Sequence, residues 1–187
     1  MQDQVKLKLL SIAEIMGNSE VGIITLVDEE EKHIMAMVCD VQMKQELHLR
    51  LSRNKVCNTM LPEILVNVLK TQVGYNFEIV INDIVDGEYR AMLVNTDTGQ
   101  PLSMRASDAV LLHLISKAPL YVSTTLFRRQ AMPYIPGSPS MALPFNVLTD
   151  KMLQEAMDYA VEHENYEMAS KFRDELKKRG KLLRPEV

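Results

Sequence analysis

The sequence has no tryptophan, only 5% aromatic residues and just two cysteines among 187 residues. Cys39 and Cys57 are too few for a disulfide framework. Neither cysteine belongs to a CxxC pair or has a histidine at the spacing of metal ligands, so we expect no metal site on them. No apolar run approaches the roughly 20 residues needed to cross a bilayer, and residues 1–16 lack the continuous apolar segment of a signal peptide. We therefore expect a cytoplasmic protein with no membrane partner.

A large excess of charge of one sign is also missing. Lys and Arg number 21 against 25 Asp and Glu, which makes the net charge −4. This weak acidity argues against a broad, sequence-independent grip on nucleic acid, because that property requires a basic domain. A local basic patch is still compatible with it, and Arg128-Arg129 with Lys117 is the basic cluster of the N-terminal part.

Segments typical of strands dominate the first 131 residues and are more frequent than a βαβ alternation would give. Asp86-Gly87 between two of them predicts a hairpin, because a type I′ turn requires positive φ at both centres. We expect an α+β fold, with a mixed, largely antiparallel β-sheet and packed helices. The predicted strands are 5–16, 21–27, 33–38, 77–85, 88–95, a short one ending at Arg105 and 120–122; the predicted helices are 40–51, 62–73 and 107–117.

The C-terminal part differs in composition. Half of the eight prolines fall in residues 132–148, which predicts a linker between a domain at 1–131 and a helical segment at 149–187. Two helices separated near 163–165 predict an αα-hairpin. Residues 150–167 are mainly acidic and 171–184 mainly basic, so antiparallel pairing would join opposite charges. We expect Tyr166 and Phe172 in the core of this hairpin.

Two motifs resemble known families. The runs DGEYRAML and MRASDAVLLHLISKAPLYV, within Glu63 to Arg129, resemble the bifunctional nuclease (BFN) domain. The run YEMASKFRDEL, within Leu153 to Lys178, resembles the UVR motif. The first resemblance implies a nuclease acting on DNA or RNA. The second implies a helical contact module, so we expect a protein partner to bind through residues 149–180.

The chain departs from the BFN pattern at three places. A Leu-Thr-His-Asp-Leu run of the family aligns with Met60 to Ile64, which keeps the acidic position as Glu63 but has Pro62 in place of histidine. The aspartate two residues before the arginine is Ser103, and the Ile-Gly-x-x-Glu-Ala segment has no clear counterpart at 39–44. A carboxylate and a possible general base of the family are therefore missing.

The remaining residues still predict phosphate chemistry. Hydrolysis of a phosphodiester needs activated water and positive charge near the developing oxyanion. Asp108 with Glu63 would hold Mg²⁺ or Mn²⁺ through oxygen ligands. Arg105 would clamp phosphate, and Ser107 with free helix amides would complete the anion site. The candidate carboxylates and cation together are Glu63, Asp83, Asp86, Glu88, Arg105 and Asp108.

A structural interpretation of the same residues stays open. Ser107 would be the N-cap of a helix, Asp108 would interact with its dipole, and Arg105 would pair with Asp108 or Glu63. His113 would then be a hydrogen-bonded core residue. Two hypotheses follow: a metal-assisted nuclease, or a catalytically degenerate adaptor that acts through its hairpin. Because a small hairpin buries its apolar stripes poorly alone, we also expect a homodimer.

Overall fold

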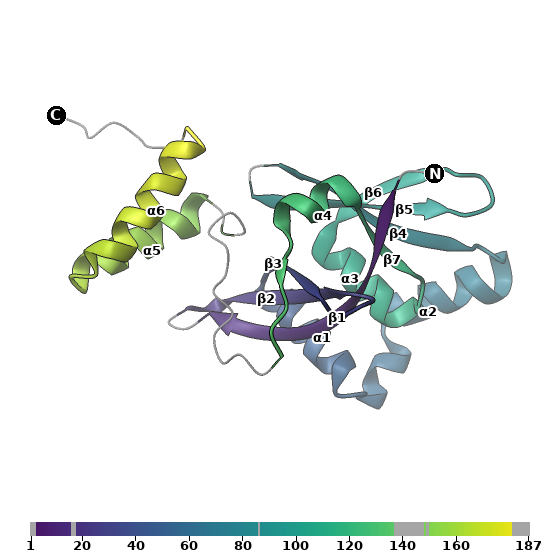
Figure 1. Ribbon diagram of the computed structural model, residues 1–187. Coiled ribbons are helices and arrows are strands. Elements are labelled where there is room, and N and C mark those ends of the chain that lie inside the picture. Colours follow the sequence, from purple (N-terminus) through teal and green to yellow (C-terminus); the bar gives the residue numbers. More distant parts are fainter. Residues whose placement is uncertain (1–2, 16–17, 86, 137–147, 149, 181–187) are drawn as a thin grey trace. The chain divides into compact units, whose positions relative to one another are not determined.

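The computed structural model describes residues 3–15, 18–85, 87–136, 148 and 150–180. The chain forms two compact units, one containing Met1–Val85 with Tyr89–Pro139 and the other containing Ser140–Val187. An eight-stranded sheet with packed helices makes up the first unit, and two helices make up the second (Figure 1). The predicted α+β class is confirmed.

The sheet of the first unit has the strand order β6-β5-β4-β7-β1-β2-β3-β8. Strand β7 lies in its middle, parallel to β4 through Ile79 and Leu120 and antiparallel to β1 through Val5 and Val122. The pairs β1–β2, β2–β3, β3–β8 and β5–β6 are antiparallel, so the sheet is mixed and largely antiparallel. The strands are β1 (Gln4–Ile15), β2 (Asn18–Asp28), β3 (His33–Asp40), β4 (Phe77–Val85), β5 (Glu88–Asn95), β6 (Pro101–Arg105), β7 (Leu120–Ser123) and β8 (Met132–Pro133).

Four α-helices and two shorter helical segments accompany the sheet. Helix α3 contacts α1, α2 and strands β3, β4 and β6, which explains why its apolar residues extend nearly all round it. Ala106, Ala109 and Val110 on α3 belong to the main core with sheet residues such as Ile79 and Leu120. The helices are α1 (Val41–Leu51), η1 (Lys55–Thr59), α2 (Leu61–Val68), η2 (Leu69–Val73), α3 (Ala106–Ser116) and α4 (Thr124–Gln130).

Most element boundaries agree with the sequence prediction, but η1, β8 and α4 were not predicted and the start of α3 differs. Helix α3 begins at Ala106 after an N-cap at Arg105, and no side chain caps it. The prediction that Ser107 is the N-cap is therefore wrong, since Ser107 lies inside the first turn. Helix α4 was not predicted; Ser123 caps it by accepting from the Leu126 N–H, and its apolar side chains are buried.

Parts of some predicted features lie outside the described residues. These parts are Gly17 in the first turn, Asp86 in the second, most of the proline-rich linker and the end of the C-terminal segment. Gly87 of the Asp-Gly pair has φ 78, a conformation that glycine adopts without strain.

The second unit is an αα-hairpin of α5 (Asp150–Glu162) and α6 (Tyr166–Lys178), as predicted. Asn165 begins α6 by accepting from the Met168 N–H at 3.2 Å. Arg179 Nη1 lies 3.1 Å from Asp150 Oδ1, which confirms the expected charge pairing between the helices. Tyr166 is 65% exposed, so placing it in the hairpin core was wrong. The buried residues of the two helices are Leu153, Ala160, Ala169 and Leu176, and Leu148 before α5 is buried as well.

Candidate functional site

Arg105 lies where strand β6 passes into helix α3. Its backbone is extended, with φ −68 and ψ 144, and the helix begins at the next residue. Asp108 follows three residues later on the same helix face. Arg105 Nε donates to Asp108 Oδ2 at 2.6 Å and Nη2 donates to Oδ1 at 3.1 Å. The two side chains therefore form a bidentate ion pair in the first turn of α3, as the structural interpretation predicted.

A second carboxylate, which the sequence did not reveal, lies beside Arg105. Asp40 is the N-cap of α1, where its Oδ1 accepts from the Met43 N–H at 2.7 Å. Its Oδ2 lies 3.6 Å from Arg105 Nη1. The N-terminal ends of α1 and α3 therefore meet at one arginine. An aspartate directly before a helical stripe is a capping signal, but nothing local in the sequence connects it to Arg105.

Arg90 adds positive charge on the neighbouring strand. In the antiparallel β5–β6 register, Arg90 is the partner of Arg105, and both residues are exposed. Directly opposed residues have Cβ atoms about 4.5–5.5 Å apart, and like charges in this position destabilise the pair. We call Arg90, Arg105, Asp40 and Asp108 the Arg105 cluster. It is a place where two guanidinium groups and two carboxylates lie close to the surface.

The ion pairs of the Arg105 cluster are accessible to solvent. The side chains of Arg105, Asp40 and Asp108 are 61%, 53% and 34% exposed. Exposed ion pairs contribute only about 0–1 kcal/mol, so an anionic ligand can replace the carboxylates around Arg105 at small cost. Ser107 is half-buried in the first turn of α3, where the backbone N–H groups have no intrahelical acceptor.

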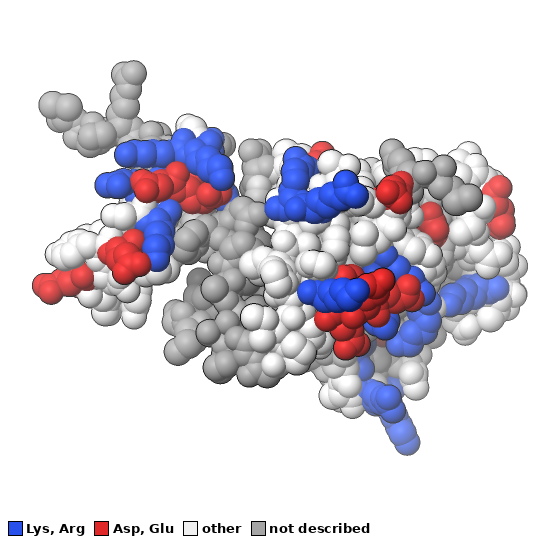
Figure 2. Space-filling view, viewed as in Figure 1, with Lys and Arg blue, Asp and Glu red and all other residues white. Residues whose placement is uncertain are grey.

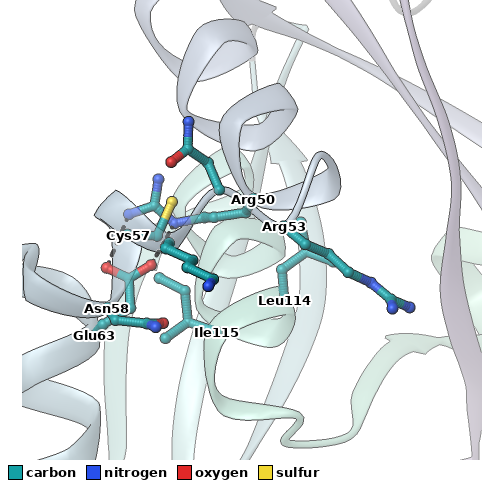
Figure 3. A pocket seen from close by; sticks show the side chains of 9 residues that line it. Arg50, Arg53, Cys57, Asn58, Glu63, Leu114 and Ile115 are labelled. Atoms are coloured by element: carbon teal, nitrogen blue, oxygen red, sulfur yellow. Dashed lines mark hydrogen bonds and ion pairs between the residues drawn. The ribbon is translucent and has the colours of Figure 1, made fainter.

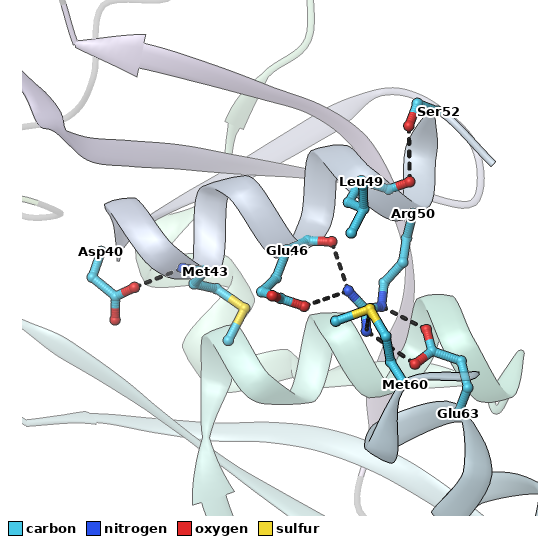
Figure 4. A network of polar contacts seen from close by, with 8 residues as sticks. All are labelled: Asp40, Met43, Glu46, Leu49, Arg50, Ser52, Met60 and Glu63. Atoms are coloured by element: carbon cyan, nitrogen blue, oxygen red, sulfur yellow. Dashed lines mark hydrogen bonds and ion pairs between the residues drawn. The ribbon is translucent and has the colours of Figure 1, made fainter. Parts of the chain in front are cut away.

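Glu63 lies in a different environment. Arg50 Nε is 2.8 Å from Glu63 Oε1, Arg50 Nη2 donates to Oε2 at 3.0 Å, and Nη1 donates to Glu46 Oε2 at 2.5 Å (Figure 4). The side chains of Arg50 and Glu63 are only 6% and 16% exposed. Burial alone would lower the pKa of Arg50, but the hydrogen bonds and charges of Glu63 and Glu46 outweigh it and raise the pKa.

Glu63 and Asp108 are held at opposite ends of helix α1. Asp40 precedes the first residue of α1 and Arg50 is in its last turn (Figure 4). Ten residues of helix rise by about 15 Å. Arg50 engages both oxygens of Glu63, whereas Asp40 contacts the partner of Asp108. A metal ion shared by Glu63 and Asp108 does not fit this arrangement, and the predicted Arg105–Glu63 pair is replaced by Arg50–Glu63.

The other candidate residues have ordinary local roles. Asp83 is exposed and its Oδ1 accepts from the Ile84 N–H at 2.8 Å. Glu88 is exposed at the start of β5. His113 Nδ1 lies 2.7 Å from the Ala118 carbonyl oxygen, which confirms the predicted hydrogen bond, and the side chain is half-buried. No group of three or more His, Cys, Asp or Glu residues suited to a metal occurs in the part of the chain that the structure describes.

Basic side chains also gather over helix α4, which contains Arg128 and Arg129 (Figure 2). In the same view, acidic and basic side chains are mixed over the turn between β2 and β3. There Lys6 pairs with Glu29 and Lys32 pairs with Glu30. The α4 patch therefore has an arginine pair at its surface, whereas the charges at the turn compensate one another.

Comparison with known protein families gives two matches. The bifunctional nuclease domain matches residues 24–134, more than half of the chain, and the UvrB/uvrC motif matches residues 151–179. A comparison with curated proteins found no match. Among the described residues, no helix has the length and apolar character required to span a membrane. The first match contains the entire Arg105 cluster, and the second coincides with helices α5 and α6.

Proposed function

Because the chain belongs to the bifunctional nuclease domain family, we propose that it hydrolyses phosphodiester bonds of DNA or RNA at the Arg105 cluster. One observation carries this proposal. Exposed Arg105 lies between two carboxylates, Asp40 and Asp108, at the point where two helix N-termini meet. Positive groups and helix amides suit phosphate oxygens, and carboxylates suit proton transfer to and from water.

Each residue of the cluster has a role in the proposed reaction. Arg105 binds a phosphate group through its forked guanidinium, and Arg90 on the adjacent strand adds to the positive charge. The first-turn amides of α3, with the Ser107 hydroxyl, stabilise negative charge that develops on the phosphoryl oxygens. One of the two carboxylates, Asp108 or Asp40, accepts a proton from the water as its oxygen bonds to phosphorus, and returns that proton to the oxygen that leaves when the other P–O bond breaks. The low cost of opening exposed ion pairs supports this exchange.

A divalent ion, Mg²⁺ or Mn²⁺, is part of the proposal, but with different ligands from those expected. Glu63 is engaged by Arg50, so Asp40 and Asp108 are the carboxylates that would hold the ion. Mg²⁺ commonly uses one or two protein carboxylates together with water and substrate phosphates. The ion would supply positive charge to the phosphoryl group. Two carboxylates are enough for an ion whose other ligands are water and the phosphate of the substrate.

A second candidate function is that of a catalytically degenerate adaptor. It is favoured because the carboxylates of the candidate site are already held in ion pairs with arginines. Both oxygens of Asp108 contact Arg105, and both oxygens of Glu63 contact Arg50. The positions of Pro62 and Ser103, where the family has histidine and aspartate, support the same hypothesis. In this case residues 149–180 bind a protein partner and the Arg105 cluster is only structural.

Cleavage assays on single- and double-stranded DNA and RNA, with Mg²⁺, Mn²⁺ or EDTA, distinguish the two functions. We expect Asp108→Asn and Arg105→Gln each to lower the cleavage rate at least tenfold, and EDTA to abolish it. Arg128→Gln, which removes an arginine from α4, is the matched control and should cleave like wild type. Equal cleavage by all three variants after identical purification would identify a contaminant and favour the adaptor.

We also propose a homodimer. In the second unit Tyr159, Val161 and Tyr166 are 61%, 50% and 65% exposed, and in the first unit Leu61 and Leu65 of α2 are 69% and 52% exposed. Exposed aliphatic and aromatic side chains suit a contact with a second copy, and Leu61 and Leu65 are four residues apart on one face of α2. Two double variants test which surface forms the dimer: Tyr159→Ser/Tyr166→Ser and Leu61→Ser/Leu65→Ser. In sedimentation, the variant that removes the contact should be a monomer, and the other should remain a dimer. A wild-type protein that sediments as a monomer at every concentration would contradict the proposal.

The proposed location is the cytoplasm. Cys39 and Cys57 are both free and buried in the structure. Reduced thiols without a disulfide partner suit a compartment in which glutathione and thioredoxin keep cysteines reduced.

A further inference from the structure

A basic pocket lies beside the C-terminal end of helix α1, away from the Arg105 cluster. We propose that this pocket is a separate binding site for a phosphate group. Its volume is about 220 Å³. Figure 3 shows the side chains that line it. We call it the η1 pocket; its lining residues are Arg50, Arg53, Asn54, Lys55, Cys57, Asn58, Glu63, Leu114 and Ile115.

The local sequence explains how the pocket forms. Helix α1 ends at Leu51, and Arg53 follows with φ 54, which turns the chain sharply. The Arg53 N–H donates to the Arg50 carbonyl oxygen at 3.0 Å. Asn54 then caps η1 by accepting from the Val56 N–H at 3.0 Å. This tight turn places consecutive polar side chains around one hollow next to helix α3.

The lining of the η1 pocket consists mainly of hydrogen-bond donors. It contributes two arginines, one lysine and two asparagine amides, against a single carboxylate. That carboxylate, Glu63, already has both oxygens on Arg50. Neither Arg53 nor Lys55 forms a side-chain ion pair with any residue in the described ranges. In a chain of net charge −4, this local surplus of positive charge suits an anionic ligand.

The buried arginine of the lining is already occupied. Arg50 contacts both oxygens of Glu63 and one oxygen of Glu46. It therefore neutralises the single carboxylate of the pocket. The positive charge that would meet a ligand comes from Arg53 and Lys55, which are exposed.

The volume of the pocket and its apolar wall indicate which class of ligand it can bind. Pockets that enclose drug-sized ligands measure about 300–1,000 Å³, so a smaller pocket suits a phosphate group with part of its sugar. Leu114 and Ile115 of α3 form an apolar wall (Figure 3), which can contact the carbon atoms of a sugar or base. A phosphate monoester such as a nucleotide fits both properties.

The η1 pocket is independent of the proposed nuclease site. Arg50 and Asp40 are separated by about 15 Å along α1, at a rise of 1.5 Å per residue. Phosphate binding at the η1 pocket therefore requires neither Arg105 nor Asp108. The inference stands or falls separately from phosphodiester hydrolysis.

Calorimetric titration with adenosine 5′-monophosphate tests the proposal. We expect saturable binding by the full chain, binding at least tenfold weaker by Arg53→Gln/Lys55→Gln, and no binding of adenosine, which lacks the phosphate. Arg128→Gln/Arg129→Gln removes the same charge from the surface of α4 and should bind like wild type. Arg105→Gln removes the phosphate-binding residue of the proposed nuclease site, and it should keep the binding event that Arg53→Gln/Lys55→Gln loses.

Several results would overturn the inference. These are an absence of binding by wild type, equal weakening in the η1-pocket and α4 double variants, or equal binding of adenosine and its monophosphate. Loss of binding only in Arg105→Gln would assign the phosphate to the Arg105 cluster. Nuclear magnetic resonance gives a second readout. The side-chain amide resonances of Asn54 and Asn58 should shift when wild type is titrated, and should stay in place in Arg53→Gln/Lys55→Gln. Circular dichroism should show that this variant is folded.

Discussion

Replacing Glu63 by glutamine should weaken the fold rather than the chemistry. The variant keeps the size of the side chain but leaves the buried Arg50 guanidinium, 6% exposed, without the negative charge that contacts its Nε and Nη2. Removing one partner of a buried ion pair costs about 3–5 kcal/mol. Glu46 still accepts from Arg50 Nη1 at 2.5 Å, so we expect about 2 kcal/mol of lost stability. For a protein of this size that corresponds to a melting temperature lower by about 4–8 °C.

Urea and thermal unfolding followed by circular dichroism measure this effect. The double variant Arg50→Met/Glu63→Met removes both charges and should unfold within about 1 kcal/mol of wild type, because apolar residues of similar volume can replace a buried pair. Asp108→Asn is the exposed counterpart and should cost no more than about 1 kcal/mol. If Glu63→Gln unfolds like wild type but no longer cleaves nucleic acid, Glu63 is catalytic and the structural argument is refuted.

Three further predictions concern other parts of the first unit. Gly22→Ala should lower the urea midpoint by the equivalent of about 1–3 kcal/mol, because a Cβ would lie 2.9 Å from both Cys39 Sγ and Lys44 Cβ; an unchanged midpoint would contradict this. Burial alone would raise the pKa of Asp28, but two backbone N–H groups and His33 hold it below its ordinary value of 3.8. Its stabilising contribution is therefore complete above that value and is lost as the pH falls through the lower folded pKa, so Asp28→Asn should flatten the acid dependence of unfolding below about pH 5. Burial, with a smaller effect of Asp40, raises the pKa of Cys39 to about 11, so iodoacetamide should label it only as the protein unfolds, and fast labelling of the native protein in mass spectra would disprove this.

Arg105 and Arg50 show how burial separates the arginine that we propose to bind phosphate from an arginine with a structural role. Each contacts two carboxylates, Arg105 with Asp40 and Asp108, and Arg50 with Glu46 and Glu63. The side chain of Arg105 is 61% exposed, whereas that of Arg50 is 6% exposed. Water already solvates Arg105, so replacing its carboxylate partners costs little free energy. Arg50 loses its solvation on folding, so removing one of its carboxylate partners costs much more.

Local signals in the sequence predicted most of the fold. Alternation of apolar residues, the Asp-Gly pair before Glu88 and the glycine at the end of η2 set the elements, and β4 and β5 have the predicted bounds. Capping was less predictable. Ser107 has the chemistry of an N-cap, but the helix begins at Ala106 because β6 continues to Arg105. Helix α4 was missed because seven residues carry too weak a periodic signal.

The sequence by itself determined the family motif, the α+β class and the C-terminal hairpin, because the motifs and strand and helix patterns behind them are local in the chain. It left the partner of Arg105 open between Asp108 and Glu63, and the structure decided for Asp108. Only the tertiary structure decided which second carboxylate lies beside Arg105. Asp40 reaches Arg105 because α1 and α3 pack together, whereas Glu63 is held by Arg50 at the other end of α1. Spacing in a sequence carries no information on such contacts, since they arise from how helices pack on a sheet. The same packing formed the η1 pocket from a turn of α1 and a face of α3.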